Sequence, residues 1–358
     1  MARRVQGDTR IVFLSEVDDC CLWKICDELA PAAPKNLIFH KVCGVDNFVQ
    51  FGKEKFFVLN RIGRHFGSLV HNWLLSLMED PSKRFVYFID DTIDYRNDNL
   101  PWKFMEKATV VLVPTETMKE YLIEKNDTIA DKITVVRTHI NLTLLGRVAP
   151  LARIDDRIQV LWGGGGLTGL PIIKDIVNYL DQKRKDIRLF CVGGKIGLAR
   201  AYFEPARNID IRYFEFLPYR DFTSVCKASL IHLNPLCTEE ANILVHDLKD
   251  PEAFIRVKAP IKFMHAGEAQ KALITTAIPS YEEVIVHGEN GFLARKRDEW
   301  IDLIKYLLDN LDQIEDIGKK ARQTVEEKFD TSLLVDQYLR VYLGDDKYEE
   351  VVMGSGVS

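Results

Sequence analysis

The sequence predicts an α/β protein of two doubly wound, parallel-sheet domains. Its 358 residues exceed what one ordinary hydrophobic core organises, so two domains are expected. Short apolar runs alternate with amphipathic stretches, which favours right-handed strand–helix–strand units with mostly parallel strands. This alternation occurs twice, before and after residues 144–157, a segment without periodicity.

In the first half, five short apolar runs closed by polar residues are typical of buried parallel strands. They span residues 10–15, 56–60, 85–89, 109–113 and 132–136. Apolar spacing predicts helices at about 22–29 and 68–78. Thr115 is expected to cap a third helix that runs through Ile123.

Gly146, Pro150 and alternating charges in 144–157 indicate an interdomain linker, after which the strand pattern restarts. Further strands are predicted at 158–162, 188–192, 230–234 and 272–276, with a helix at about 171–182 and charged helices from Glu299 onward. We therefore expect an N-terminal domain over 1–147 and a C-terminal domain over 155–332. The last helix, about 333–358, is expected to pack back on the body, with the first domain as its candidate partner.

Composition excludes several classes of protein. The chain is 47% hydrophobic and 28% charged, with net charge -5 and a pI of about 6.0, so we expect no nucleic-acid partner. Seven cysteines occur without a C-x-x-C pair, which favours reduced thiols and no zinc site. No signal peptide or run of about 20 apolar residues is found. We expect a cytoplasmic protein that can also lie at the inner face of the membrane.

Ligands of open α/β sheets bind beyond the carboxyl ends of the strands, so the residues there are site candidates. Four glycines follow the predicted strand 158–162: Gly163, Gly164, Gly165 and Gly166. Their backbone N–H groups can approach a phosphate, and the following helix N-terminus favours negative charge. The spacing is not G-x-G-x-x-G, so a tight turn without ligand is the alternative. After the next strand, Lys195 follows two glycines and offers a cation.

Lys258 and Lys262 stand four residues apart just before an apolar helix and can clamp a diphosphate if they face one way. The alternative is a solvated helix start. His265 lies about one turn beyond Lys262. In the first half, Asp90 and Asp91 close an apolar strand, where paired carboxylates can act as a base, bind sugar hydroxyls or cap a turn.

The second half resembles the C-terminal domain of retaining GT-B glycosyltransferases of the glycogen-synthase-like group. Residues 262–293 are similar to that family's K-[LF]-x-E-x-x-A-x-G-x-P segment followed by E-[IV]-I-x-x-G-x-N-G-[FL]-L; the latter reads E-V-I-V-H-G-E-N-G-F-L from Glu283. Residues 216–219 and 233–236 fall at the family's V-P-Y and P-L positions. The first half resembles the family more loosely, at 85–91 and 109–122.

The sequence departs from the family pattern at several positions. His265 stands where the family has the second Glu of its E-x7-E pair, which binds the donor ribose, and Val257 stands where it has the first. Gln270 and Ala272 replace the glycine and proline of Gly-x-Pro. Asp90 occupies the place of a His that ends the N-terminal strand in many relatives.

The resemblance implies a GT-B fold, in which two Rossmann-like doubly wound domains face each other across a cleft, and a glycosyltransferase of polysaccharide biosynthesis. It would move a sugar from a nucleoside-diphosphate sugar, its co-substrate, to a hydroxyl of a glycan, lipid-linked sugar or protein. Transfer would be retaining, with no metal and no cofactor. The first domain would engage the acceptor and the second the donor.

We expect catalytic roles for Asp90, Asp91 and Lys262. The expected donor-binding residues are Gly164, Gly165, Gly166, Lys195, Lys258, His265 and Thr276. Two alternatives remain: a catalytically silent homologue that assembles with a partner glycosyltransferase, and a nucleotide-sugar epimerase, which would need no acceptor.

Overall fold

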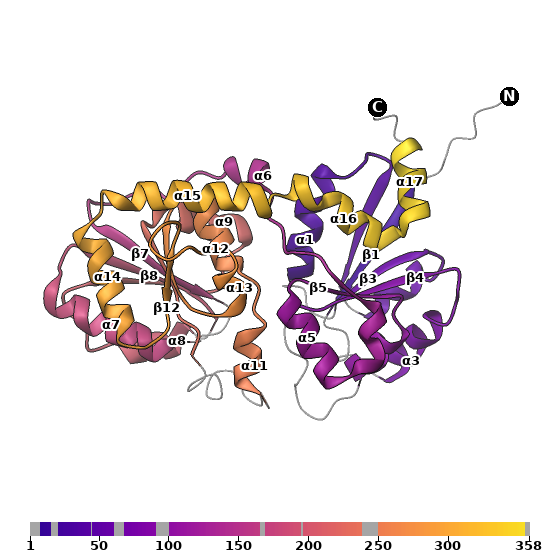
Figure 1. Cartoon of the computed structure of the whole chain (residues 1–358), viewed down its shortest axis with the longest axis horizontal. Coiled ribbons are helices and arrows are strands. Elements are labelled where there is room, and N and C mark those ends of the chain that lie inside the picture. The colour runs from indigo at the N-terminus through magenta and orange to yellow at the C-terminus, as the bar shows by residue number, and fades with distance from the viewer. Residues whose placement is uncertain are drawn as a thin grey trace. The chain divides into compact units, whose positions relative to one another are not determined.

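The computed structural model describes residues 8–15, 21–43, 45–60, 68–90, 100–164, 169–194, 196–237 and 250–354. The chain divides into two compact units (Figure 1), the first formed by residues 1–141 and 330–358 and the second by residues 142–329. Each unit holds one six-stranded sheet in which all paired strands are parallel. The predicted doubly wound α/β class is confirmed.

The sheet of the first unit has the order β2-β1-β3-β4-β5-β6. Its strands are β1 (Thr9–Ser15), β2 (Leu37–Cys43), β3 (Phe56–Asn60), β4 (Arg84–Phe88), β5 (Val110–Val113) and β6 (Ile133–Val135). The sequence did not predict β2. This strand lies at the edge of the sheet and leaves His40 half-buried and Lys41 exposed, so it lacks the continuous apolar run of a central strand.

Helices cover this first sheet. They are α1 (Cys21–Leu29), α2 (Val45–Phe48), α3 (Ser68–Leu77), α4 (Leu100–Lys107), α5 (Glu116–Lys125), α16 (Thr331–Leu343) and α17 (Asp345–Gly354), with short 3-10 turns at Ala30–Ala32, Val49–Phe51 and Asp127–Lys132. The predicted cap of α5 is confirmed, because Thr115 Oγ1 accepts a hydrogen bond of 3.1 Å from the Met118 N–H.

The C-terminal helices α16 and α17, yellow in Figure 1, lie among the indigo elements of the first unit. Leu334, Tyr338 and Tyr342 join the same buried cluster as Ile11 and Phe13 of β1. The Tyr342 ring meets the Phe13 ring edge-on at 5.5 Å. About 190 residues after the chain leaves this unit, it therefore returns to complete its core.

The sheet of the second unit has the order β12-β11-β10-β7-β8-β9. Its strands are β7 (Ile158–Gly164), β8 (Ile187–Gly193), β9 (Asp210–Phe214), β10 (Ile231–Asn234), β11 (Ala272–Thr276) and β12 (Phe292–Ala294). The sequence did not predict β9 and β12, which are the two edges of this sheet. Strand β9 is half-buried to exposed along its length, and β12 has only three residues.

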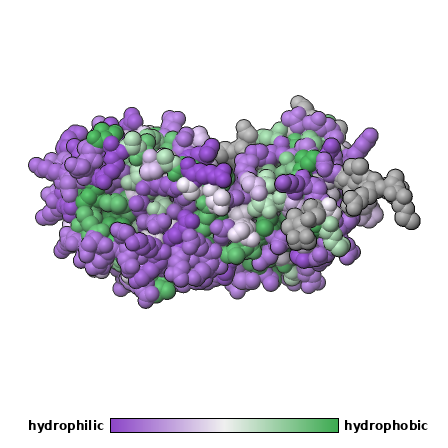
Figure 2. Space-filling view, turned by 90° about the horizontal axis from the view of Figure 1, so that it is seen from above, coloured by the Kyte–Doolittle hydropathy of each residue, from purple (hydrophilic) through white to green (hydrophobic). Residues whose placement is uncertain are grey.

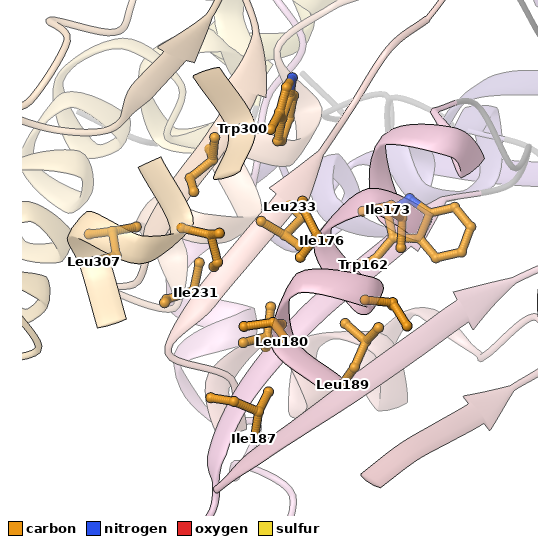
Figure 3. Packing of buried hydrophobic residues seen from close by; sticks show 14 of the residues in the cluster. Trp162, Ile173, Ile176, Leu180, Ile187, Leu189, Ile231, Leu233, Trp300 and Leu307 are labelled. Atoms are coloured by element: carbon orange, nitrogen blue, oxygen red, sulfur yellow. The ribbon is translucent and has the colours of Figure 1, made fainter. Parts of the chain in front are cut away.

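The described helices of the second unit are α6 (Leu142–Gly146), α7 (Leu170–Lys183), α8 (Ile196–Phe203), α9 (Tyr219–Ala228), α11 (Pro251–Arg256), α12 (Ile261–Glu268), α13 (Pro279–Glu282), α14 (Glu299–Asp309) and α15 (Gln313–Lys328). Figure 3 shows their core, where Leu180 of α7, Ile231 of β10 and Leu307 of α14 gather in one cluster.

The predicted linker, 144–157, lies within the second unit. Its first residues complete α6, in which Leu145 is buried. The Lys227 ammonium donates hydrogen bonds to the carbonyls of Leu145 at 2.7 Å and Val148 at 2.9 Å, and it pairs with the buried Glu268 at 3.1 Å. These contacts hold the segment to α9 and α12, although its sequence lacks periodicity.

Hydrophilic residues cover most of the face seen in Figure 2. Among the described helices, none is both long enough and apolar enough to cross a membrane.

Candidate functional site

The strand order of the second unit locates a candidate site at the carboxyl ends of β7 and β10. Strand β7 lies between β8 and β10, so the chain leaves it toward one side of the sheet and later returns to the other. Gly164 ends β7, and Asn234 ends β10. Ligands of doubly wound sheets bind in the crevice at such a switch point.

Buried polar side chains fix the backbone beyond β10 and β11. The Asn234 amide donates hydrogen bonds to the hydroxyls of Thr275 at 2.9 Å and Tyr281 at 3.0 Å. The hydroxyl of Thr276, a predicted donor-binding residue, accepts from the Leu236 N–H at 2.8 Å and donates to the Leu236 carbonyl at 3.1 Å. Through these two hydrogen bonds, Thr276 holds the loop after β10 in place.

The two predicted clamp lysines lie over different aromatic rings. The Lys258 ammonium is 3.6 Å from the centroid of Phe254 in α11, and the Lys262 ammonium is 4.5 Å from that of Phe222 in α9. Because α12 begins at Ile261, Lys258 precedes the helix, and the four-residue spacing does not set both lysines on one helical face. Cation–π attraction holds each ammonium group near its ring.

The carbonyl of Lys258 accepts a hydrogen bond from the Ser280 hydroxyl of α13. Neighbouring Tyr281 binds Asn234 through its hydroxyl. Helix α13 therefore ties the lysine-bearing connection to the end of β10. Asn234, Ser280 and Tyr281 were not predicted as site residues, because their contacts join residues more than 20 positions apart.

His265 is buried, with 4% of its surface exposed. Its ring packs edge-to-face against the rings of Tyr219 at 5.6 Å and Phe222 at 5.3 Å. His265 and Lys262 thus share Phe222 as a neighbour.

Of the predicted glycines, Gly164 pairs in register with Gly193 at the end of β8. Gly165 and Gly166 lie outside the described residues, as do Lys195 and Asp91. Gly169, just before α7, has a φ of 79°, and a Cβ there would come within 2.5 Å of Pro235 beyond β10. Glycine at 169 is therefore required both by its left-handed backbone and by close packing across the switch point.

The first unit has its own switch point between β1 and β3, whose last residues, Ser15 and Asn60, are paired in register and buried. The Asn60 amide donates hydrogen bonds to the Phe88 carbonyl at 2.9 Å and to Asp90 Oδ1 at 3.3 Å. Asp90 is half-buried directly beyond β4. Asn60, which no sequence pattern identified, thus orients one of the predicted catalytic residues.

Within the described ranges, the buried cysteines Cys26 and Cys226 are poor candidates for nucleophiles, and no cluster of metal ligands is found. Burial raises the pKa of the Cys26 and Cys226 thiols to about 12, which keeps both protonated near neutral pH. No group of three or more His, Cys, Asp or Glu side chains within those ranges could hold a metal ion.

Residues 168–310 match the family model described as glycosyl transferases group 1, which confirms the family resemblance of the second half. No curated protein sequence matches the chain significantly. Several solved structures share its fold. HepE of Anabaena, solved with UDP and glucose, has 12% identity and a TM-score of 0.68 over 93% of this chain and 98% of its own.

A glycosyltransferase of Rickettsia africae has 14% identity and a TM-score of 0.64 over 96% of this chain and 99% of its own. Sucrose-phosphate synthase of Thermosynechococcus elongatus has 12% identity and a TM-score of 0.64 over 93% and 98%. At these identities the likeness shows a shared fold, that of GT-B glycosyltransferases.

Proposed function

Because residues 168–310 form a glycosyl transferases group 1 segment, we propose that this chain moves a sugar from a nucleoside-diphosphate sugar to a hydroxyl acceptor. The observation that carries the proposal is the pair of cations, Lys258 and Lys262, held on aromatic rings beside the switch point of the second unit. Because the structure of HepE contains UDP, uridine diphosphate sugars are the first donors to test.

The lysines would bind the donor diphosphate and stabilise the charge that grows on it as it leaves. One positioned donor group of this kind is worth about 3–4 kcal/mol in the transition state. Gly164, Gly165 and Gly166 would offer backbone N–H groups, Lys195 a third cation, and Thr276 would hold the loop that faces the donor. With this charge supplied by side chains, the proposed transfer needs no metal.

His265 would lie beside the donor ribose, at the position of the family's Glu. A carboxylate accepts hydrogen bonds from two ribose hydroxyls, whereas a neutral imidazole accepts one and donates one. The edge-to-face packing of the ring on Tyr219 and Phe222 restricts its orientation. We therefore expect His265 to contribute less to donor affinity than either lysine.

Asp90, oriented by Asn60, and its neighbour Asp91 would contact the transferred sugar or the acceptor hydroxyl. The proposed reaction is retaining. The bond between the anomeric carbon and the diphosphate oxygen breaks, the bond to the acceptor oxygen forms on the same face, and the acceptor proton passes to the departing diphosphate. The acceptor would be a glycan, a lipid-linked sugar or a protein side chain.

Thermal unfolding with UDP, GDP, CMP, dTDP and their sugars tests donor binding first. A ligand at about 100 times its Kd adds about 2.7 kcal/mol to the stability of the folded state, which gives a readable rise in Tm. We expect this rise with one base family, and we expect Lys262→Met to make it much smaller. The matched control is Lys305→Met, which changes an exposed lysine on α14.

Absence of a shift with every nucleotide would contradict the proposal. Donor binding without sugar release or transfer to any hydroxyl acceptor would instead favour the silent homologue. A changed nucleotide sugar formed without acceptor would favour the epimerase.

A further inference from the structure

One aromatic ring, Phe222 of α9, contacts three parts of the proposed donor site. Its face lies under the Lys262 ammonium, 4.5 Å from the centroid, and its ring meets that of His265 at 5.3 Å and 86°. Its Cε2 atom also lies where a side chain at Gly163 would go, 2.9 Å from the position of an added Cβ. Phe222 thus joins the glycine end of β7 to two residues of α12.

We propose that Phe222 is a positioning residue of the donor site, and that Gly163 is glycine to make room for it. The proposal rests on the proposed function for its consequence in donor binding. The proposal gives Gly163 a new role. The sequence alone predicts only that its backbone lies close to a phosphate or forms a tight turn.

The physical basis is the charge distribution of an aromatic ring. Its negative face attracts the Lys262 ammonium, and an edge-to-face arrangement with His265 matches a positive edge to a negative face. One ring contacts both neighbours, so a rotation of Phe222 changes the surroundings of a cation and an imidazole together. Phe222 is half-buried and also packs against a buried apolar cluster that includes Leu161, Phe190 and Val225.

Alanine at position 163 would force the ring to move. A Cβ at 2.9 Å from Cε2 is closer than real Cβ contacts. Strand β7 cannot yield easily, because Gly163 is paired with Val192 of β8 and its neighbour Trp162 with Leu233 of β10. The side chain of Phe222 gives way instead, and its contacts with Lys262 and His265 change without any direct contact from the new methyl group.

The first experiment needs no nucleotide. We would record the imidazole NMR resonances of His265, assigned by their loss in His265→Gln, for Gly163→Ala, Phe222→Leu and the control Phe39→Leu. Phe39 is a half-buried ring on β2 of the other unit. Gly163→Ala and Phe222→Leu should both shift the His265 signals, and Phe39→Leu should leave them in place. Unmoved signals in Gly163→Ala would overturn the proposal.

Urea unfolding gives a second readout of the same contact. Gly163→Ala should lower the denaturation midpoint in the wild-type background and lower it much less in Phe222→Leu, because the smaller side chain removes the clash. Equal losses in the two backgrounds would mean that Gly163 does not make room for Phe222.

The consequence for the donor is tested by the Kd of UDP. Phe222→Leu should weaken binding about fivefold to tenfold, the scale of one cation–π contact, while Phe222→Tyr, which keeps the ring face, should stay within about twofold. Lys262→Met combined with Phe222→Leu should be no weaker than the worse single variant. Additive losses, or Tyr as poor as Leu, would contradict positioning through Lys262. If the wild type binds no nucleotide, the proposed function fails, and the NMR and urea experiments still decide the role of Phe222.

Discussion

The two units present opposite chemistry at equivalent places. At the switch point of the first, Asn60 holds the Asp90 carboxyl group. Beside the switch point of the second, Phe254 and Phe222 hold the ammonium groups of Lys258 and Lys262. Both sheets are parallel, six-stranded and doubly wound. The shared fold therefore supplies the location of a site, whereas the side chains around it decide which charge it can stabilise.

The manner of support also differs. An amide hydrogen bond orients the carboxyl group of the first unit, and aromatic faces orient the cations of the second. Hydrogen bonds are directional, so Asp90 is restricted in angle. A ring face attracts a cation over a broad area, so the lysines can follow a diphosphate while they stay close to it.

The largest expected effect is on the rate of transfer, and it tests whether the first unit acts in catalysis while the second binds the donor. Asp90→Asn should lower the transfer rate by about 1,000-fold, near 4 kcal/mol in the transition state, and leave the Kd of the donor nucleotide unchanged. Steady-state transfer assays and nucleotide titration measure the two quantities. Asp131→Asn, at an exposed carboxylate of the same unit, is the control. Loss of nucleotide affinity in Asp90→Asn would break the assignment of the donor to the second unit.

Acid should destabilise both units through buried histidines. Burial lowers the pKa of His232 in β10 to about 4, and burial also lowers that of His139 in the first unit, despite the nearby Glu28. The unfolded chain takes up protons near pH 6.5, before the folded chain does. Stability present above pH 6.5 is therefore lost as pH falls toward 4, with His232 contributing up to about 3 kcal/mol.

Urea unfolding from pH 7.5 to 4.5 measures this loss. His232→Gln removes the titrating group and offers an amide to the Cys226 carbonyl, which now lies 2.9 Å from the imidazole Nε2. The variant should lose less stability than the wild type over that range. Identical pH dependence in the two proteins would show that His232 is not the group responsible.

A smaller effect probes close packing in the second unit. A Cβ at Gly318 of α15 would come within 2.2 Å of the Gln270 carbonyl oxygen, so Gly318→Ala should cost about 2 kcal/mol. Gly197 of α8 has open space around its Cβ position, and Gly197→Ala should gain about 0.5–1 kcal/mol from helix propensity. Chemical denaturation measures the free energy of unfolding of both variants. Equal effects would mean that α15 moves away from Gln270 at little cost.

The smallest effect concerns backbone strain at Gln270, which lies in the second unit. Gln270 has a φ of 55°, and no other non-glycine residue in the described part of either unit has a positive φ. The family pattern that residues 262–293 resemble has glycine at this position. Gln270→Gly should raise the free energy of unfolding by about 0.5–1 kcal/mol, because relief of the left-handed conformation exceeds the added entropy of the unfolded chain. A destabilised variant would show that the turn carries no such cost.

The sequence alone determined the central strands, the cap at Thr115 and the α/β class. Each of these depends on a periodicity or a residue type within one element, and such patterns report which of its own faces the element buries. Strands β2 and β9 were not predicted because strands at the edge of a sheet need no continuous apolar run, and β12 was not predicted because it has only three residues. The resemblance to the family in the segment after Lys262 could also be identified from the sequence, because its residues are contiguous.

Only the tertiary structure decided what the candidate residues touch. It set Lys258 and Lys262 over separate rings, joined Asn60 to Asp90 across 30 positions, and brought Phe222 between Gly163 and His265. These contacts link elements that are adjacent in space and distant along the chain. Their geometry depends on how helices pack on the sheet, which no local pattern of residues encodes.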